Sequence, residues 1–251
     1  MESTAERFAR YQDSLASRLR YEQAQHNLQA LHDLSRPRRV LDAAGGNGLN
    51  TEFLAGLGHR VTLLDSDPAM LEQARARLAE RGLLQRCEFV EGSLEAVADV
   101  VPRDRFDLVL CHHALEYTSE PLRVLEGFSA VSCASGEASL ITLNPVSEVV
   151  RAIVFRRDPA LARQKLADLA YDARWFGQAT LYPFEQILEW AGRSGWSLGD
   201  FRAIRVLADY LPEAEAAGRE DQVIALEKDL AALDPYRRFG RYFQFCLTRR
   251  P

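Results

Sequence analysis

The sequence has very little lysine. Only Lys165 and Lys228 occur among 251 residues, so 29 of the 31 basic residues are arginine. A GC-rich genome is the ordinary cause of such a bias, although arginine also suits bidentate contacts with anions. The net charge of −5 argues against a protein that binds nucleic acid by bulk charge alone.

Cysteine is also scarce, and the four cysteines form no Cys-x-x-Cys pair. Three of them lie in apolar runs, which predicts buried, reduced thiols in a cytoplasmic protein rather than a disulfide framework. The pair His112-His113 has no neighbouring cluster of cysteine or histidine, so we expect no metal site.

Long apolar runs are missing as well. No run reaches the ~18 residues that a membrane-spanning helix needs. The first twenty residues carry too many charges for a secretory signal. These absences favour a cytoplasmic protein that does not cross a membrane, and the length suits one large α/β domain.

Strand and helix patterns alternate through the middle of the chain. Short apolar runs over 39–42, 60–65, 87–92, 106–112 and 138–143 predict strands, and residues 49–57, 68–81 and 121–131 predict the helices between them. Such alternation is typical of a Rossmann-like, doubly wound sheet that is mostly parallel. Ligands bind such sheets at the carboxyl ends of the strands, near the point where the strand order reverses.

The flanking segments complete a single predicted domain over 1–251. Residues 1–35 form an N-terminal helical cap (helix over 5–34), and residues 36–145 form the core. After Asn144-Pro145 the alternation stops, and residues 146–180 predict a helical lid insertion. The remaining residues, 181–251, are expected to return to the sheet, with a helix over 213–233 and an antiparallel C-terminal strand over 241–248.

A glycine-rich loop follows the first strand. Asp42 is followed by Ala43-Ala44-Gly45-Gly46-Asn47-Gly48 and then by a helix, the arrangement of a nucleotide-binding loop. Asp65 ends the next strand, where a carboxylate accepts both hydroxyl protons of a ribose. The loop departs from the Gly-x-Gly-x-x-Gly pattern at Thr51, and Asp42 suits a cationic amino group better than a pyrophosphate. The loop therefore favours S-adenosylmethionine over a nicotinamide dinucleotide.

On these motifs, the sequence over 36–145 resembles the class I S-adenosylmethionine methyltransferases. It departs from them at Ala44, where glycine is usual, and alanine resists a positive φ. The resemblance implies S-adenosyl-L-methionine as cofactor and transferase activity. The implied cofactor-binding residues are Asp42, Ala44, Gly45, Gly46, Gly48, Asp65, Ser66, Ser93, Leu94 and His112. His112 has three possible roles: a wall of the cofactor site, which we favour, a catalytic base, or a core histidine.

A narrower resemblance extends over nearly the whole chain. The segments Leu115-Glu116-Tyr117, Arg205-Val206 with Asp209-Tyr210-Leu211, and Gly240-Arg241-Tyr242 look like those of bacterial tRNA 5-carboxymethoxyuridine methyltransferases. That family methylates the carboxylate of a modified wobble uridine. The resemblance implies tRNA as partner, a role in tRNA processing, and contact between Arg20 and the cofactor carboxylate. The family's Lys-Gly pair before Arg20 is absent, as is a lysine-rich stretch in the lid.

A carboxylate acceptor needs alignment rather than a base, because it is already ionised at pH 7. We therefore predict no catalytic residue, and an acceptor site formed by Tyr117, Asn144, Arg205, Tyr210 and Arg241. Residues 146–251 hold 16 basic and 15 acidic residues, whereas residues 1–145 hold 15 and 21. Eight arginines are accordingly expected around the mouth of the cofactor pocket: Arg151, Arg156, Arg157, Arg174, Arg205, Arg237, Arg238 and Arg241.

Two other functions remain open from the residues. A small-molecule O-methyltransferase fits the acidic overall charge and the scarcity of lysine, and it requires a closed apolar pocket under 146–180. A non-catalytic protein that binds S-adenosylmethionine is also compatible with the loop and Asp65.

Overall fold

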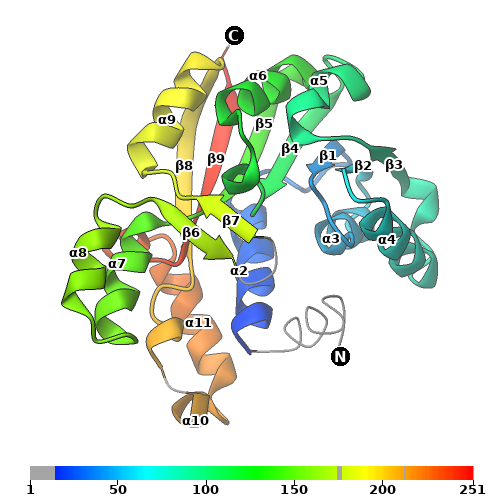
Figure 1. The fold of residues 1–251 in the computed structure, drawn as a ribbon. Helices are drawn as coiled ribbons and strands as arrows, with labels where there is room; N and C mark the ends of the chain where they lie inside the picture. The colour runs from blue at the N-terminus through cyan, green and yellow to red at the C-terminus, as the bar shows by residue number, and fades with distance from the viewer. Residues whose placement is uncertain (1–14, 174–176, 212, 251) are drawn as a thin grey trace. The chain divides into compact units, whose positions relative to one another are not determined.

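The computed structural model describes residues 15–173, 177–211 and 213–250 (Figure 1). The chain divides into two compact units. Unit 1 comprises the chain up to Leu28, Thr142–Phe184 and Phe201–Gln244, and unit 2 comprises Gln29–Ile141, Glu185–Asp200 and the chain from Phe245 onward. The single domain over 1–251 stays a prediction.

The predicted Rossmann-like α/β fold is confirmed. A seven-stranded sheet has the order β3-β2-β1-β4-β5-β9-β8. β1 pairs in parallel with β2 and β4, β2 with β3, and β4 with β5. The strands are β1 (Arg39–Ala43), β2 (Arg60–Asp65), β3 (Cys87–Glu91), β4 (Phe106–His112), β5 (Ser132–Leu143), β8 (Trp196–Ile204) and β9 (Tyr242–Arg249). The strand order reverses between β1 and β4, so this is where a ligand site is expected.

The strands of unit 2 are almost continuously apolar because helices cover both faces of a parallel sheet. After its first residue β1 is buried throughout, and so are the central residues of β2. The helices between these strands are α3 (Leu49–Gly56), α4 (Pro68–Glu80), α5 (Val97–Val100) and α6 (Pro121–Val131), followed later by α9 (Phe184–Arg193). The start of α4 is fixed locally, since the Asp67 carboxylate accepts the Ala69 N–H at 2.8 Å and Pro68 occupies the first helical position.

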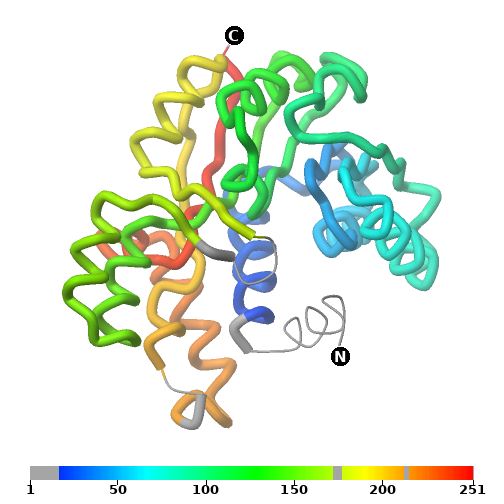
Figure 2. The backbone as a smooth tube through the Cα atoms, viewed as in Figure 1, coloured from blue at the N-terminus to red at the C-terminus, as the bar shows by residue number. Residues whose placement is uncertain are grey.

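Unit 1 brings together segments that are far apart in the sequence. Its elements include most of α2 (Leu15–Leu31), together with α7 (Pro145–Val154), α8 (Pro159–Lys165), β6 (Ala170–Ala173), β7 (Gly177–Thr180), α10 (Glu213–Ala216) and α11 (Glu220–Leu230). α2 lies beside α11, as the chain trace in Figure 2 shows, and the Gln23 amide donates to the Glu227 carbonyl at 2.8 Å. Asn27 likewise donates to the Ala203 carbonyl at 3.0 Å.

β9 is antiparallel to its neighbours, as expected. The Asn144 N–H, just after β5, donates to the carbonyl of Arg241, just before β9. The Arg241 N–H in turn donates to the carbonyl of Arg205, just after β8. The ends of β5 and β8 therefore meet the start of β9, which reverses the direction of the last strand (Figure 1).

The insertion after β5 differs from its expected form. Helices α7 and α8 lie within 145–165, but β6 and β7 pair as an antiparallel ribbon rather than forming a helix. Gly177, the first residue of β7, has a φ of 80°, which glycine adopts without strain and which is not a helical value. The helix predicted over 213–233 is also interrupted, at Gly218, between α10 and α11. Residues 5–14 of the predicted first helix lie outside the described residues.

Within the described part of the chain, no helix is long and apolar enough to cross a membrane. The same residues contain no group of three or more His, Cys, Asp and Glu side chains that could hold a metal ion. The four cysteines are free thiols.

Candidate functional site

The predicted cofactor residues of unit 2 meet at one edge of its sheet. Ala43 at the end of β1 pairs with Leu64 in β2 and with Cys111 in β4, and Asp65 pairs with Glu91 at the end of β3. Parallel strands therefore end side by side. The glycine-rich loop, Asp65, the Ser93-Leu94 pair and His112 all follow or end these strands. The structure thus brings together every predicted cofactor residue except Arg20, which lies in unit 1.

The glycine-rich loop turns through positive φ angles. Ala44, Gly46 and Gly48 have φ values of 57°, 56° and 80°. Ala44 therefore adopts the left-handed conformation that glycine tolerates better, at a cost of roughly 1 kcal/mol. Gly45 is restricted by packing instead, because a Cβ there would lie 2.7 Å from Leu63 Cγ and 2.9 Å from Asp42 Cγ.

Asp65 fixes the loop and still offers lone pairs to a ligand. One carboxylate oxygen accepts the Gly46 N–H at 2.8 Å, and the other accepts the Asp67 N–H at 3.0 Å. Each carboxylate oxygen has two acceptor positions, so one position on each remains for a ribose hydroxyl. The half-buried carboxylate can therefore hold the loop and a ribose at the same time.

Asp42 lies directly beneath the loop and is buried. The Thr51 hydroxyl donates to its Oδ2 at 2.7 Å. Burial raises the pKa of Asp42, the Thr51 hydrogen bond opposes the shift and the charge of Asp65 adds to it, so that the pKa lies at about 6. The departure at Thr51 from the dinucleotide pattern thus has a structural reason: Thr51 supplies the hydroxyl that pairs with Asp42.

His112 is held in place by two side chains. Its Nε2 lies 3.0 Å from Ser139 Oγ, and its Nδ1 lies 3.3 Å from the Asn50 amide nitrogen. An amide N–H can only donate, so Nδ1 accepts and Nε2–H donates to Ser139. Burial, aided by the charge of His32, lowers the pKa of His112 to about 3. His112 is therefore neutral near pH 7 and too weak a base for proton abstraction, which supports the role of a site wall.

These residues fit S-adenosylmethionine. The loop leaves open space beside Gly46, where no described atom lies within 4 Å of the position that a Cβ would occupy. Asp65 provides a ribose acceptor, and exposed Ser66 and Ser93, with the buried Leu94, follow the second and third strands. A bound cofactor would supply an electrophilic methyl group on a sulfonium ion. The individual roles of these residues, and contact between Arg20 and the cofactor carboxylate, stay predictions.

Unit 1 contains a second polar site, built around Arg241. The Arg241 guanidinium is 7% exposed and forms an ion pair with Glu148 on α7. It also donates to the Tyr171 hydroxyl at 3.0 Å. Burial disfavours the charge of Arg241, but Tyr242 and Glu148 among its neighbours outweigh burial and raise the pKa above its ordinary value. Arg241 therefore remains charged inside the unit.

Two more arginines extend this site through Asp209. The Arg205 Nε donates to Asp209 Oδ1 at 2.6 Å, and an Arg151 amino group donates to Oδ2 at 2.8 Å. We call these five residues, Arg151, Arg205, Arg241, Glu148 and Asp209, the arginine cluster. It contains three guanidinium groups and two carboxylates, so it has an excess positive charge.

The arginine cluster also affects buried Tyr242. Burial would raise the pKa of the Tyr242 hydroxyl, whereas the charges of Arg205, Arg20 and Arg241 lower it below its ordinary value. Arg20, predicted to reach the cofactor, is therefore electrostatically linked to the cluster. Burial raises the pKa of Tyr210, the remaining predicted aromatic of this unit.

The loop that carries Arg205, Asp209 and Tyr210 is positioned by Glu227. This carboxylate is 2% exposed and accepts three backbone N–H groups, from Val206 at 2.6 Å, Leu207 at 2.7 Å and Ala208 at 2.6 Å. Sequence reasoning missed Glu227, because an acidic residue in a charged helix has the pattern of a solvated surface. It also gave no role to Glu148 or Tyr171, since their link to Arg241 is purely tertiary.

Two other predicted acceptor residues, Asn144 and Tyr117, lie outside the arginine cluster. Asn144 uses its side chain to cap α7, accepting the Val146 N–H, and to donate to the carbonyls of Arg238 and Gly240. It thus positions backbone, and any contact with an acceptor stays a prediction, as it does for Tyr117, which lies in unit 2.

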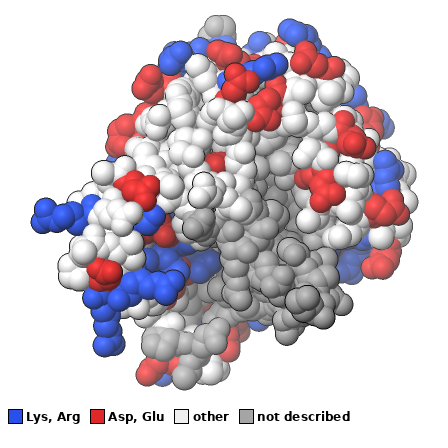
Figure 3. All heavy atoms as spheres, in the orientation of Figure 1, with Lys and Arg blue, Asp and Glu red and all other residues white. Residues whose placement is uncertain are grey.

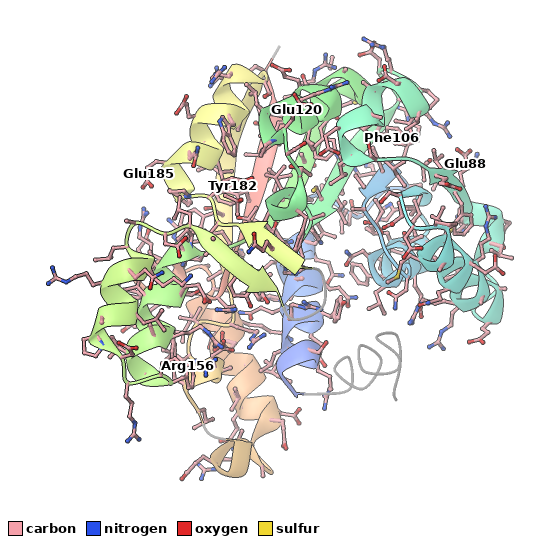
Figure 4. The ribbon with its side chains drawn as sticks, viewed as in Figure 1. Glu88, Phe106, Glu120, Arg156, Tyr182 and Glu185 are labelled. Carbon is pink, nitrogen blue, oxygen red and sulfur yellow. The ribbon has the colours of Figure 1, made fainter. Side chains whose placement is uncertain are left out.

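The arginines expected to gather at the pocket mouth are only partly together. Arg151, Arg205 and Arg241 share the arginine cluster. Arg237 and Arg238 pair with Asp234 instead, and Arg174 lies outside the described residues. Arg156 and Arg157 are exposed at the end of the α7–α8 hairpin, where Figure 4 labels Arg156.

Residues 40–136 match the family model of a methyltransferase domain. The chain is 27% identical to the tRNA 5-carboxymethoxyuridine methyltransferase of Escherichia coli (strain K12) over 220 residues, covering 85% of this chain and 80% of the relative. It is 33% identical to a ubiquinone biosynthesis O-methyltransferase of Vibrio cholerae over 107 residues, which span 43% of this chain and 42% of that relative.

Among solved structures, the fold is similar to a Burkholderia thailandensis 1,6-didemethyltoxoflavin-N1-methyltransferase that was determined with S-adenosylhomocysteine. The TM-score is 0.58 at 18% identity, and the match covers 92% of this chain and 78% of that chain. Such low identity establishes the shared fold. The matched methyltransferase domain and the methyltransferase relatives assign S-adenosylmethionine-dependent methyl transfer to this chain.

Packing around the glycine-rich loop predicts opposite effects of two Gly→Ala substitutions. Gly45→Ala should lower the free energy of unfolding by roughly 1–3 kcal/mol, because its Cβ overlaps Leu63 and Asp42. Gly56→Ala, at the end of α3 with open space around it, should raise stability by up to about 1 kcal/mol. Urea unfolding of both variants measures this, and calorimetry should show weakened S-adenosylmethionine binding only for Gly45→Ala. Equal stabilities would contradict the packing argument.

The buried His112 predicts a pH dependence of stability. Its pKa is about 3 in the folded state and about 6.5 when unfolded, so the unfolded state takes up the proton first as pH falls. The stabilisation is complete above pH 6.5 and is lost toward pH 3. From about pH 7.5 to about pH 5 the wild type should lose about 2 kcal/mol more than His112→Asn does. Urea unfolding of both proteins across this range measures the difference. If the two free energies of unfolding change by the same amount with pH, the pKa of His112 is not lowered and the prediction is wrong.

Replacing the Glu227 carboxylate by an amide should greatly lower the free energy of unfolding. Glu227→Gln should cost roughly 2–4 kcal/mol, because an amide NH₂ then faces a backbone N–H that the carboxylate had accepted. Glu189→Gln on α9 is the matched control, since that side chain is 64% exposed and should change stability by less than about 0.5 kcal/mol. Chemical denaturation compares the two, and a cost for Glu227→Gln no larger than the control's would contradict the assigned role.

Proposed function

We propose that this protein, an S-adenosylmethionine-dependent methyltransferase, methylates the carboxylate of 5-carboxymethoxyuridine at the wobble position of tRNA. The observation that carries the proposal is the arginine cluster, in which three guanidinium groups, that of Arg241 buried and those of Arg205 and Arg151 partly buried, outnumber two carboxylates. A buried excess of positive charge is costly unless an anion compensates it. An acceptor carboxylate is such an anion.

A carboxylate acceptor also agrees with the absence of a suitable base among the described site residues of unit 2. His112 is too weak a base, with a pKa of about 3, and Asp42 is buried and bonded to Thr51. A phenol or amine acceptor would have to lose a proton during methylation, whereas a carboxylate is ionised already. The chemistry then depends on alignment, which can supply roughly 7–11 kcal/mol of the barrier reduction.

The transfer itself is balanced without any further reactant. A carboxylate oxygen of the acceptor forms a bond to the methyl carbon while the bond from that carbon to sulfur breaks. The products are a methyl ester and S-adenosylhomocysteine. In this scheme Arg241 and Arg205 hold the acceptor carboxylate in a fixed orientation, as bidentate guanidinium groups can. Each carboxylate oxygen keeps a second lone pair, with which one oxygen can react. Tyr210 lies next to Asp209 for contact with the uracil ring.

The extent of the similarity to known proteins supports the same acceptor. The Escherichia coli tRNA enzyme aligns with 85% of the chain, which necessarily includes much of unit 1. The residues of the arginine cluster all belong to unit 1. The ubiquinone O-methyltransferase aligns with only 43% of the chain, little more than the extent of a methyltransferase domain.

A small-molecule O-methyltransferase is the second candidate. It is supported by the higher identity, 33%, to the ubiquinone enzyme over the shared segment. A phenolic acceptor of that kind would find few apolar partners in the arginine cluster. The two candidates differ in their product: a carboxylate gives a methyl ester that mild alkali hydrolyses, whereas a phenol gives a stable ether.

The proposed function predicts ester formation on one class of tRNA. Purified enzyme and labelled S-adenosylmethionine should methylate tRNA from a bacterial strain that accumulates unmethylated 5-carboxymethoxyuridine, and mild alkali should release the label. tRNA that lacks the carboxymethoxy group should accept no methyl. If the first tRNA also remains unlabelled while a phenolic quinone precursor is methylated, the small-molecule function replaces this one.

Arg241→Lys tests the cluster within the same assay. Lysine keeps the charge but loses the planar pair of donors, so KM for the tRNA should rise roughly 10–100-fold. Cofactor affinity, measured by calorimetry, should change little. Arg193→Lys is the matched control, because Arg193 is 58% exposed on α9.

A further inference from the structure

The helix α7 presents its apolar side to solvent. Its buried residues are Ser147 and Ala152, whereas Val146, Ile153, Val154 and the adjoining Phe155 are 45–48% exposed. An amphipathic helix of a globular protein normally buries its apolar side. Val146, Ile153 and Val154 recur at helical spacing on one side of α7, and exposed apolar side chains grouped in this way mark an interaction site.

Phe155, which directly follows α7, is held in place by two neighbouring side chains. Its ring is parallel to that of Tyr210, with an interplanar angle of 10° and centroids 5.8 Å apart. The Arg151 guanidinium lies 4.9 Å from the Phe155 centroid and is fixed by its ion pair with Asp209. A ring that is already immobilised loses little conformational entropy when a partner stacks on it.

The charge next to Phe155 is positive. Arg156 and Arg157 follow directly and are exposed, and neither forms an ion pair with any described carboxylate. The nearest acidic residue in sequence, Asp158, uses its carboxylate to cap α8 by accepting the Leu161 N–H at 2.9 Å. Figure 3 shows Lys and Arg side chains gathered over the part of unit 1 that contains α7 and α8.

We propose that Phe155, Arg156 and Arg157, together with the exposed side chains Val146, Ile153 and Val154, form a docking surface for single-stranded RNA, in which an unpaired base stacks on Phe155. Aromatic rings beside arginines are the usual platform for unpaired bases, since every base has a π face and phosphates attract guanidinium groups. The surface adjoins the arginine cluster, because Arg151 contacts both Phe155 and Asp209. A nucleotide next to the methylated one can therefore reach Phe155.

This inference rests on the proposed function and gives it a second contact, outside the acceptor nucleotide. It also accounts for RNA binding by an acidic protein. The required positive charge is local, on the α7–α8 hairpin, while the two carboxylates of the arginine cluster are turned inward to Arg241, Arg205 and Arg151.

Phe155→Ala tests the surface with two unmodified RNA probes, a hairpin with an unpaired loop and a fully paired duplex of equal length. The variant should bind the hairpin at least fivefold more weakly, a change of about 1 kcal/mol. Duplex binding and the salt dependence of hairpin binding should remain as in the wild type, because stacking releases no counterions. Phe155→Trp should restore hairpin affinity. The matched control is Leu226→Ala on α11, whose side chain is equally exposed at 49%.

A double substitution, Arg156→Glu with Arg157→Glu, should act differently. It should lower the salt dependence of hairpin binding, by a slope of about 0.7 for each phosphate that the protein no longer neutralises. Unchanged hairpin affinity in Phe155→Ala, or an equal weakening on the duplex, would overturn the proposal. So would a wild-type dimer that Phe155→Ala dissociates without affecting RNA binding, or Phe155-dependent binding to phosphatidylglycerol vesicles in place of RNA.

The two proposals fail separately. If the wild type does not methylate the carboxylate-bearing tRNA but hairpin binding depends on Phe155, the proposed function fails and the docking surface stands. If that tRNA is methylated with the same KM by the wild type and Phe155→Ala, the function stands and the docking surface fails.

Discussion

Much of unit 1 depends on one buried carboxylate. Glu227 accepts three consecutive backbone N–H groups and so fixes the loop after β8. Gln23 on α2 completes this arrangement, since its side chain accepts the Arg205 N–H and donates to the Glu227 carbonyl. The loop then places Arg205 and Asp209 where they meet Arg151 from α7. Without this interaction, three arginines from distant segments would have no common scaffold.

In unit 2, carboxylates that accept hydrogen bonds likewise fix a loop, here the glycine-rich loop of the cofactor site. Buried Asp42, bonded to Thr51, lies beneath the glycine-rich loop, and Asp65 holds the loop through the Gly46 N–H. Both carboxylates accept hydrogen bonds from protein donors before any ligand binds. The site is therefore preformed, which lowers the entropic cost of binding and helps align a reacting methyl group.

The two units differ in the titratable and charged groups that they contain. In unit 2, His112 is a weak base, and Asp42 is buried beneath the loop and bonded to Thr51, so neither side chain suits proton abstraction. In the arginine cluster of unit 1 the positive charges exceed the negative ones. The proposed methylation of a carboxylate is a reaction that needs no proton transfer but does need an anion held in place, so it is compatible with both features.

Sequence alone determined the parallel sheet and the glycine-rich loop, because strand periodicity, capping residues and glycine positions act over a few neighbouring residues. It also placed Asp65 and His112 correctly at strand ends, since parallel strands must end at one edge. It did not determine the pairing of β6 with β7, or the exposed apolar side of α7, because the apolar spacing in that helix is typical of an ordinary buried face. Only the tertiary structure decided that Arg241 pairs with Glu148 and Val206 with Glu227, because these partners are far apart in the chain. Burial gives the contacts their strength, and burial exists only once the chain has folded.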